Sequence, residues 1–152
     1  MKQPVINIMT YVLDDNQTVV KLIEQAFKNV GILNYRTFQD EIEFLTCLND
    51  DVHVAVIDYV LKGEINGLQV AVKLLEENPR CYVIIMSSQE SNKVIIEFMN
   101  AGAWKYVQKE GNYILEVVSY VQKAAQLIKK DIEFYTTLIE KYNAVSDGST
   151  NY

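Results

Sequence analysis

The sequence lacks the features that mark membrane, secreted and nucleic-acid-binding proteins. No apolar run reaches the roughly 18 residues that a membrane helix requires. The amino-terminal segment has no cleavage-site pattern and is interpreted as a first strand, not a signal peptide. The net charge is −6 and no basic stripe is present, which argues against nucleic acid as a partner. We therefore expect a cytoplasmic protein that binds neither membrane nor nucleic acid.

Cysteine, glycine and proline are also scarce. Cys47 and Cys81 are far apart, have no metal-ligand spacing and are interpreted as buried thiols of a reducing compartment. Six glycines and two prolines in 152 residues exclude a collagen-like or proline-rich disordered chain. Because 49% of the residues are hydrophobic, the chain can bury the core of one ordinary globular domain.

Apolar runs alternate with segments of helical periodicity, and this alternation is the main indication of the fold. The expected strands are residues 5–13, 34–38, 52–57, 82–86 and 104–108. Helices are expected between them, with Gly31 ending the first and Asp40 capping the second. Repeated strand–helix alternation predicts an α/β fold, a parallel sheet with helices on both faces.

Polar residues stand where four of the expected strands end. Asp14 and Asp15 follow the first strand, Asp58 the third, Ser87 the fourth and Lys109 the fifth. Ligands of such sheets bind beyond the carboxyl ends of the strands. The pattern therefore predicts that three carboxylates, a hydroxyl and an ammonium group meet at one edge.

Three carboxylates in one cleft repel each other, so a cation or a proton must accompany them. Mg²⁺ is the expected cation, because it prefers oxygen ligands and keeps several of its waters. A carboxylate can itself accept a phosphoryl group, which would give an acyl phosphate. His53, the only histidine, begins the third strand at the far end from this cluster, and we expect a structural role for it.

These motifs resemble the receiver domains of two-component response regulators. The resemblance covers about residues 5–128 and rests on the acidic pair, on Val-Ile-Asp ending at Asp58, on Ser87-Ser88 and on the segment 102–109 that ends at Lys109. It implies a flavodoxin-like, doubly wound sheet of five parallel strands in the order 2-1-3-4-5, with five helices.

The resemblance implies a role for each residue of the acidic cluster. Asp58 would be the phospho-acceptor. Asp14, Asp15, Asp58 and the backbone carbonyl of Val60 would hold Mg²⁺, with Asp14 acting through water. Because the Val60 side chain has no polar group to orient a water, we expect slow loss of the phosphoryl group.

The resemblance also implies a switch, and the sequence departs from the family beside it. Ser87 and Lys109 would contact the phosphoryl group, and Ser87 and Tyr106 would change conformation together. Glu110 stands where the family usually has proline, which leaves the geometry of the last strand–helix loop open and adds a negative charge nearby. The loop after Asp58 is one residue longer than usual.

We therefore expect a single-domain response regulator, and not an enzyme beyond its own phosphorylation and dephosphorylation. A histidine kinase or phosphotransfer protein would donate the phosphoryl group, and a protein effector would read the result. One alternative is an atypical receiver that acts as a docking or dimerisation module without phosphorylation. A second is a Mg²⁺-dependent phosphatase, although the adjacent Asp14 and Asp15 lack the Asp-x-Asp spacing of that class.

The last helix is expected to continue beyond the receiver domain. Apolar residues alternate at spacings of four and three from Ile114 to Tyr142, the period of a coiled coil. We divide the chain into a receiver domain (1–128), a helical extension (129–143) and a flexible tail (144–152). The extension would run on or follow a break, and it would form a homodimer, bind another partner or fold back onto its own domain.

Overall fold

The computed structural model describes residues 7–49, 51–89 and 91–148, and within them strands and helices alternate. The strands are β1 (Met9–Leu13), β2 (Tyr35–Phe38), β3 (Val52–Asp58), β4 (Tyr82–Ser87) and β5 (Lys105–Gln108). The helices are α1 (Gln17–Asn29), α2 (Glu41–Thr46), α3 (Gly67–Glu77), α4 (Asn92–Asn100) and α5 (Tyr113–Ser146).

All five strands are parallel and lie in the order β2-β1-β3-β4-β5, as predicted. β1 begins at Met9, so Asn7 and Ile8 are not in the strand, although the prediction started at residue 5. The reason lies at Met9, whose N–H donates to the ring nitrogen Nδ1 of His53 (3.0 Å) beside an irregularity in the β1–β3 register. Residues 5 and 6 lie outside the described ranges.

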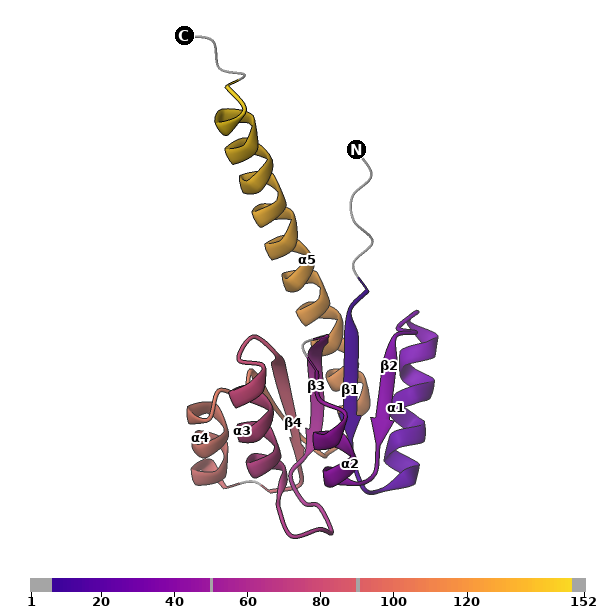
Figure 1. Ribbon diagram of the computed structural model, residues 1–152. Helices are drawn as coiled ribbons and strands as arrows, with labels where there is room; N and C mark the ends of the chain where they lie inside the picture. Colours follow the sequence, from indigo (N-terminus) through magenta and orange to yellow (C-terminus); the bar gives the residue numbers. More distant parts are fainter. Residues whose placement is uncertain (1–6, 50, 90, 149–152) are drawn as a thin grey trace.

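Helices cover both faces of the sheet, and each face has its own core (Figure 1). On one face α1 and α5 pack over Val54 and Val56 of β3. On the other, α2, α3 and α4 pack over Ala55 and Ile57 of the same strand. A central strand that is buried on both faces needs apolar residues at successive positions, which is why β3 reads as a continuous apolar run.

Local signals explain several helix ends. The Asp40 carboxylate accepts the Glu43 N–H (2.8 Å), which confirms the predicted cap of α2, and Gly31 ends α1 with φ of 80°. Of the two cysteines, Cys81 is buried as predicted. Cys47 is only half-buried, because it lies at the exposed end of the short helix α2.

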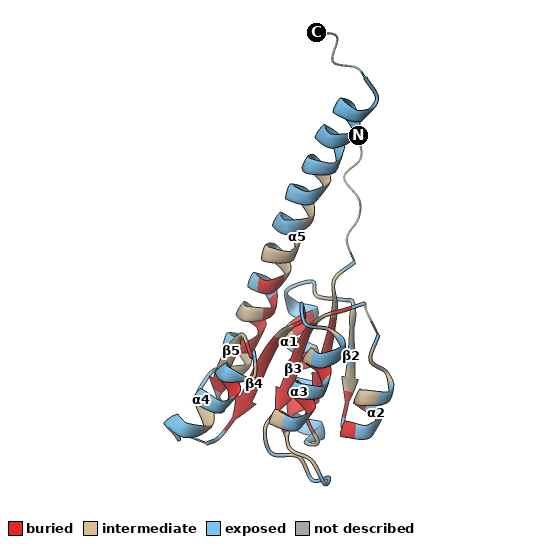
Figure 2. Ribbon diagram, turned by 60° about the vertical axis from the view of Figure 1, so that its left-hand side comes forward, coloured by how far each residue is buried: buried red, intermediate tan, exposed pale blue. Residues whose placement is uncertain are grey.

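Helix α5 leaves the body of the protein at the amino edge of the sheet and projects away from it (Figure 1). It passes residue 128 without a break and does not fold back, and its outer half is exposed (Figure 2). It ends three residues beyond the predicted end at Asn143, so the expected tail is helical through Ser146. Its stop signal is Gly148, which has φ of 67°.

The remaining four residues of the expected tail, 149–152, are not among the described residues. Neither α5 nor any other helix of the described ranges is long and apolar enough to cross a membrane.

Candidate functional site

The carboxyl edge of the sheet brings together acidic and basic side chains from three strands. Asp14 follows β1 with 0% of its surface exposed, and Asp58 ends β3 with 5% exposed. The ammonium nitrogen of Lys109, just after β5, lies 2.8 Å from Asp14 Oδ2 and 3.1 Å from Asp58 Oδ1. One lysine thus bridges two buried carboxylates from distant parts of the chain.

Asp15 completes an acidic cluster with the two bridged aspartates. Single carboxylate oxygens of Asp14, Asp15 and Asp58 lie within 4.8 Å of one another. A cluster of three carboxylates beside one ammonium group leaves negative charge that a divalent cation would neutralise, and the ligands are the hard oxygens that Mg²⁺ prefers. The residues present therefore fit a Mg²⁺ ion.

The pKa values of Asp58 and Lys109 are both raised, as expected where negative charge exceeds positive charge. Burial and the charge of Asp14 raise the pKa of Asp58 to about 6, although Lys109 opposes the shift. For Lys109, burial lowers the pKa, but the hydrogen bond to Asp14 and the two negative charges outweigh it, so its pKa lies above the ordinary value. Without a bound cation, Asp58 is therefore protonated more readily than an ordinary aspartate.

Backbone contacts fix Asp58 and Asp14 in place. A Cβ atom on Gly67, the first residue of α3, would lie 2.2 Å from the carbonyl oxygen of Asp58, so the helix can approach the strand this closely only with glycine. The Gly67 N–H donates to the Tyr59 carbonyl (2.9 Å). At β1, Asp14 Oδ1 accepts the N–H of Asn16 (2.8 Å), which turns the chain into α1.

Ser87 and Tyr106 are joined through one residue of the loop between β4 and α4. The hydroxyl of Ser87, which is 1% exposed, accepts the N–H of Gln89 (2.9 Å). The hydroxyl of Tyr106 donates to the carbonyl of the same Gln89. Any movement of this loop must therefore change the hydrogen bonds of both side chains.

The loops around the cluster contain the positions that depart from the resemblance. Glu110 is exposed, accepts a long hydrogen bond from the Gln108 side chain (3.4 Å) and precedes Gly111, which has φ of 53°. The Lys109–Glu110 peptide bond is trans. Val60 lies in the loop after β3 with 55% of its surface exposed, so the loop is open to solvent at that point.

Sequence reasoning did not single out Tyr113, the first residue of α5. Burial raises its pKa, Lys109 lowers it, and the charges of Asp14 and Asp58 raise it further, so its ring stands beside the cluster. The signal was present: a helix that follows β5 begins at the carboxyl edge, and its first residue is placed there. Gly67 was equally readable, because it opens a helix directly after the loop from Asp58.

Comparison with known proteins identifies the family of this chain. Residues 10–130 match the response regulator receiver domain, and the chain belongs to that family. An NtrX-like response regulator of Rickettsia conorii is 24% identical over 142 residues, which is 91% of this chain and 30% of that protein. A protein-glutamate methylesterase/protein-glutamine glutaminase of Rhodopseudomonas palustris is 30% identical over 78% of this chain and 35% of that protein.

Solved structures share the fold at low sequence identity. The BeF3-activated receiver domain of DrrB, a Thermotoga maritima protein, has a TM-score of 0.70 at 22% identity. The match includes 78% of this chain and 97% of that domain. A Burkholderia pseudomallei response regulator with a phosphorylated aspartic acid and a calcium ion has a TM-score of 0.65 at 16% identity, over 95% of this chain and 87% of that one. The chain spans about a third or less of the curated relatives it matches.

Proposed function

We propose that Asp58 accepts a phosphoryl group in a Mg²⁺-dependent reaction and that the modified domain signals to a protein partner. The observation that carries this proposal is the bridge from Lys109 to Asp14 and Asp58 beside a third carboxylate, Asp15. Membership of the receiver family supports two-component phosphorelay signalling as the general role. Mg²⁺ would be held by the three aspartates and the backbone carbonyl of Val60.

In the reaction, a carboxylate oxygen of Asp58 attacks phosphorus and the bond from phosphorus to the donor atom breaks. The electron pair leaves with the donor, which is the imidazole nitrogen of a phosphohistidine or the acyl oxygen of acetyl phosphate. When bound, Mg²⁺ supplies positive charge that offsets the charge on the phosphoryl oxygens. Lys109 already lies 3.1 Å from Asp58, so it contacts the transferred group, and the Ser87 hydroxyl donates a hydrogen bond to it.

The signal would pass through Gln89. When Ser87 turns toward the phosphoryl oxygens it gives up the Gln89 N–H, and Tyr106 then loses its acceptor as the loop moves. Phosphorylation adds a charge of about −1.5 to −2, which biases this two-state equilibrium. The donor is a histidine kinase or phosphotransfer protein, and a protein effector recognises the changed surface.

The proposal is tested by incubating the chain with Mg²⁺ and acetyl phosphate and measuring its intact mass. We expect one phosphoryl adduct on the wild type, none on Asp58→Asn, and none in EDTA. Asp51→Asn is the matched control, because Asp51 is an exposed aspartate at the opposite edge of the sheet, just before β3. This variant should be labelled like the wild type.

Failure has two distinguishable forms. An adduct that persists on Asp58→Asn would move the acceptor to another residue. The absence of any adduct, under conditions that label another receiver domain, would favour the docking module that works without phosphorylation. If the wild type is phosphorylated, Tyr106→Phe should give the same yield of adduct. The variant should differ from the wild type in the amide hydrogen-exchange protection of the loop around Gln89.

A further inference from the structure

The outer half of α5 carries large apolar side chains that no other described residue covers (Figure 2). An isolated helix gains nothing from exposing such residues, so a contiguous group of them marks a surface that binds a partner. The residues and their exposed fractions are Phe134 61%, Tyr135 57%, Leu138 46%, Ile139 59%, Tyr142 72% and Val145 62%.

Three of these exposed side chains form a regular seam with Ile132, which is half-buried. Ile132, Tyr135, Ile139 and Tyr142 follow one another at spacings of three, four and three, which are the a and d positions of a heptad repeat. The same spacing leads back to Val121, which is 2% exposed and packs onto the sheet. The face of α5 that packs in the core of the domain therefore continues past the edge of the sheet as the seam.

This shared face restricts the direction of a second helix. The seam drifts by only about 20° per heptad, so past the sheet it still faces the side on which the domain lies. If a second copy of α5 lay parallel to the first along the seam, the first half of its helix would overlap the domain of the first copy. An antiparallel copy avoids the clash, because its tip points at the edge of the sheet and its domain lies beyond the tip of the first helix.

The side chains match in the antiparallel direction. In antiparallel coiled coils, a positions pack in layers against d positions. One register places Ile132 against Tyr142 of the second copy and Tyr135 against Ile139, and symmetry repeats both layers, so every layer pairs one isoleucine with one tyrosine. Leu138 then lies within one turn of Leu138 of the second copy, beside the seam.

Charges at the two ends of this segment are complementary in the same register. Asp131 comes within one turn of Lys141 of the second copy, and Lys129 within one turn of its Asp147. In a parallel pair, each of these charged residues would instead lie level with the same residue of the second copy, so like charges would meet. Lys129 and Asp131 stand at the e and g positions that flank the seam. An opposite charge within reach of each on the second copy favours the antiparallel direction, because charges at these positions influence the orientation of coiled coils.

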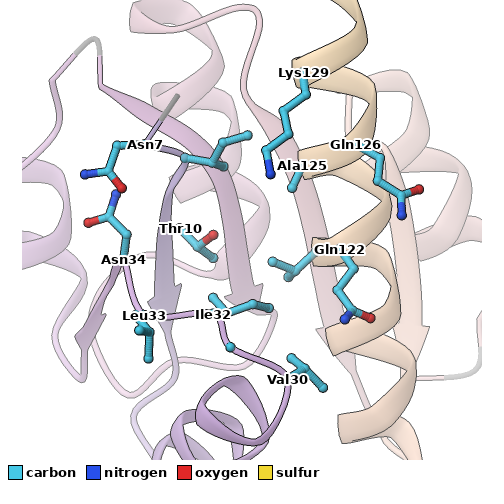
Figure 3. A pocket seen from close by; sticks show the side chains of 13 residues that line it. Asn7, Thr10, Val30, Ile32, Leu33, Asn34, Gln122, Ala125, Gln126 and Lys129 are labelled. Atoms are coloured by element: carbon cyan, nitrogen blue, oxygen red, sulfur yellow. The ribbon is translucent and has the colours of Figure 1, made fainter. Parts of the chain in front are cut away.

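Among the described residues, a groove lies on each side of α5 at the edge of the sheet, where the tip of the second helix would arrive. One of about 550 Å³ is lined by Arg80, Asp131 and Tyr135 among others. The other, of about 430 Å³, lies between the end of α1, the start of β1 and α5, and Lys129 lines it (Figure 3). Lys129 and Asp131, the two charged residues paired above, thus face opposite grooves.

We propose that two copies of this chain associate as an antiparallel pair through residues 128–146 of α5. The end of each helix is seated against the amino edge of the other copy's sheet. The acidic clusters lie at the opposite edges and point outward, so both stay open to a phosphoryl donor. The assembly does not depend on phosphorylation and can be tested apart from it.

The test is the molar mass of the full chain by sedimentation equilibrium over a range of concentrations. We expect a dimer for the wild type, a monomer for Ile139→Asp, and a dimer for Thr137→Asp, which places the same charge on the outer face of the same turn. Ile139 is exposed within one chain, so Ile139→Asp should keep the thermal unfolding of the monomeric domain and serves as its own folding control.

The direction is tested with a charge exchange. Asp131→Lys and Lys141→Glu should each weaken the dimer, and the double variant should restore it, because these residues meet only in an antiparallel pair. A wild type that stays monomeric would overturn the proposal and assign the seam to a different protein or another segment of a longer chain. A dimer that Ile139→Asp breaks but that shows no rescue in the double variant would overturn the antiparallel arrangement.

Discussion

At the carboxyl edge of the sheet, Asp14 and Asp58 are almost fully buried, whereas His53 and Asn78 at the amino edge are half-buried. The amino-edge groups make single neutral hydrogen bonds that close the structure. His53 accepts the Met9 N–H, and the Asn78 side chain donates to the Val52 carbonyl (2.7 Å). The same strands therefore carry charge that destabilises the metal-free fold at one edge and neutral bonds that stabilise it at the other.

This difference separates function from stability within one sheet. Burying two carboxylates beside one lysine costs free energy that a satisfied neutral bond does not cost. The carboxyl edge would recover that free energy on binding the proposed cation or phosphoryl group, which would make it responsive to ligands. The amino edge has nothing to recover, so it can serve as a rigid base for the projecting helix.

The largest effect should come from Gly67→Ala at the carboxyl edge. The added Cβ would lie 2.2 Å from the Asp58 carbonyl oxygen and 2.8 Å from the Tyr59 Cα, and backbone atoms cannot move aside without disturbing the site. We expect a loss of about 3 kcal/mol in the free energy of unfolding, measured with urea.

Gly31→Ala is the matched change at the amino edge. Gly31 has φ of 80° but nothing within 4 Å of an added Cβ, so only the conformational cost of about 1 kcal/mol applies. Equal losses for the two variants would show that close packing on Asp58 does not constrain the carboxyl edge.

The second prediction concerns the charge of Asp58 in metal-free protein. Its pKa of about 6 lies above the ordinary value of 3.8, so the folded state holds a proton that the unfolded state releases, and ionisation destabilises the fold. This destabilisation is complete above about pH 6 and absent below about pH 4. Asp58→Asn should therefore raise the free energy of unfolding by about 2 kcal/mol at pH 8 and leave it unchanged near pH 4.

Urea unfolding in EDTA at the two pH values measures this difference. Adding Mg²⁺ at pH 8 should stabilise the wild type more than Asp58→Asn, since the variant has lost one carboxylate ligand. A variant that is less stable than the wild type at pH 8 in EDTA would mean that Lys109 already compensates the charge of Asp58.

The carboxyl edge was largely predictable because parallel strands share one direction. Placing Asp58 and Lys109 at strand ends was enough to bring them together across 50 residues of intervening sequence. What the strand ends could not reveal is that Lys109 lies closer to Asp14 than to Asp58, since that depends on the path of one side chain. Tyr113 was not singled out, although the first residue of a helix that follows β5 must lie at the carboxyl edge.

The ends of elements were less predictable than their existence. The tail from Ala144 was predicted to be flexible because its residues are small and polar, yet alanine continues a helix readily and Gly148 is the real stop. The capping box of α3, in which Asn66 and Gln69 exchange hydrogen bonds, was readable from their spacing of three. Whether the outer end of α5 is covered depends on a binding partner, and the sequence of one chain does not identify that partner.

The third prediction concerns the amino edge. Burial lowers the pKa of His53 below 6.5, although the charge of Asp51 opposes the shift, so the folded state favours the neutral ring. Its contribution is complete above pH 6.5 and declines as the pH falls below that value, because the unfolded state takes up the proton first. His53→Leu should cost about 1 kcal/mol at pH 8, and the gap to the wild type should narrow at pH 5. Urea unfolding at both pH values measures it, and a gap that widens at pH 5 would contradict the neutral-acceptor role.

The smallest effect is expected from Glu110→Gln, which changes charge at the carboxyl edge without touching the buried cluster. Glu110 is exposed and its hydrogen bond to Gln108 is long, so solvent screens its field at Asp58. We expect a change below about 0.5 kcal/mol in stability and below about threefold in the rate of labelling by acetyl phosphate. A much larger gain in rate would mean that the charge of Glu110 reaches the phosphoryl site despite its exposure. The charges that influence the buried cluster would then include the exposed Glu110 and would not stop at Lys109.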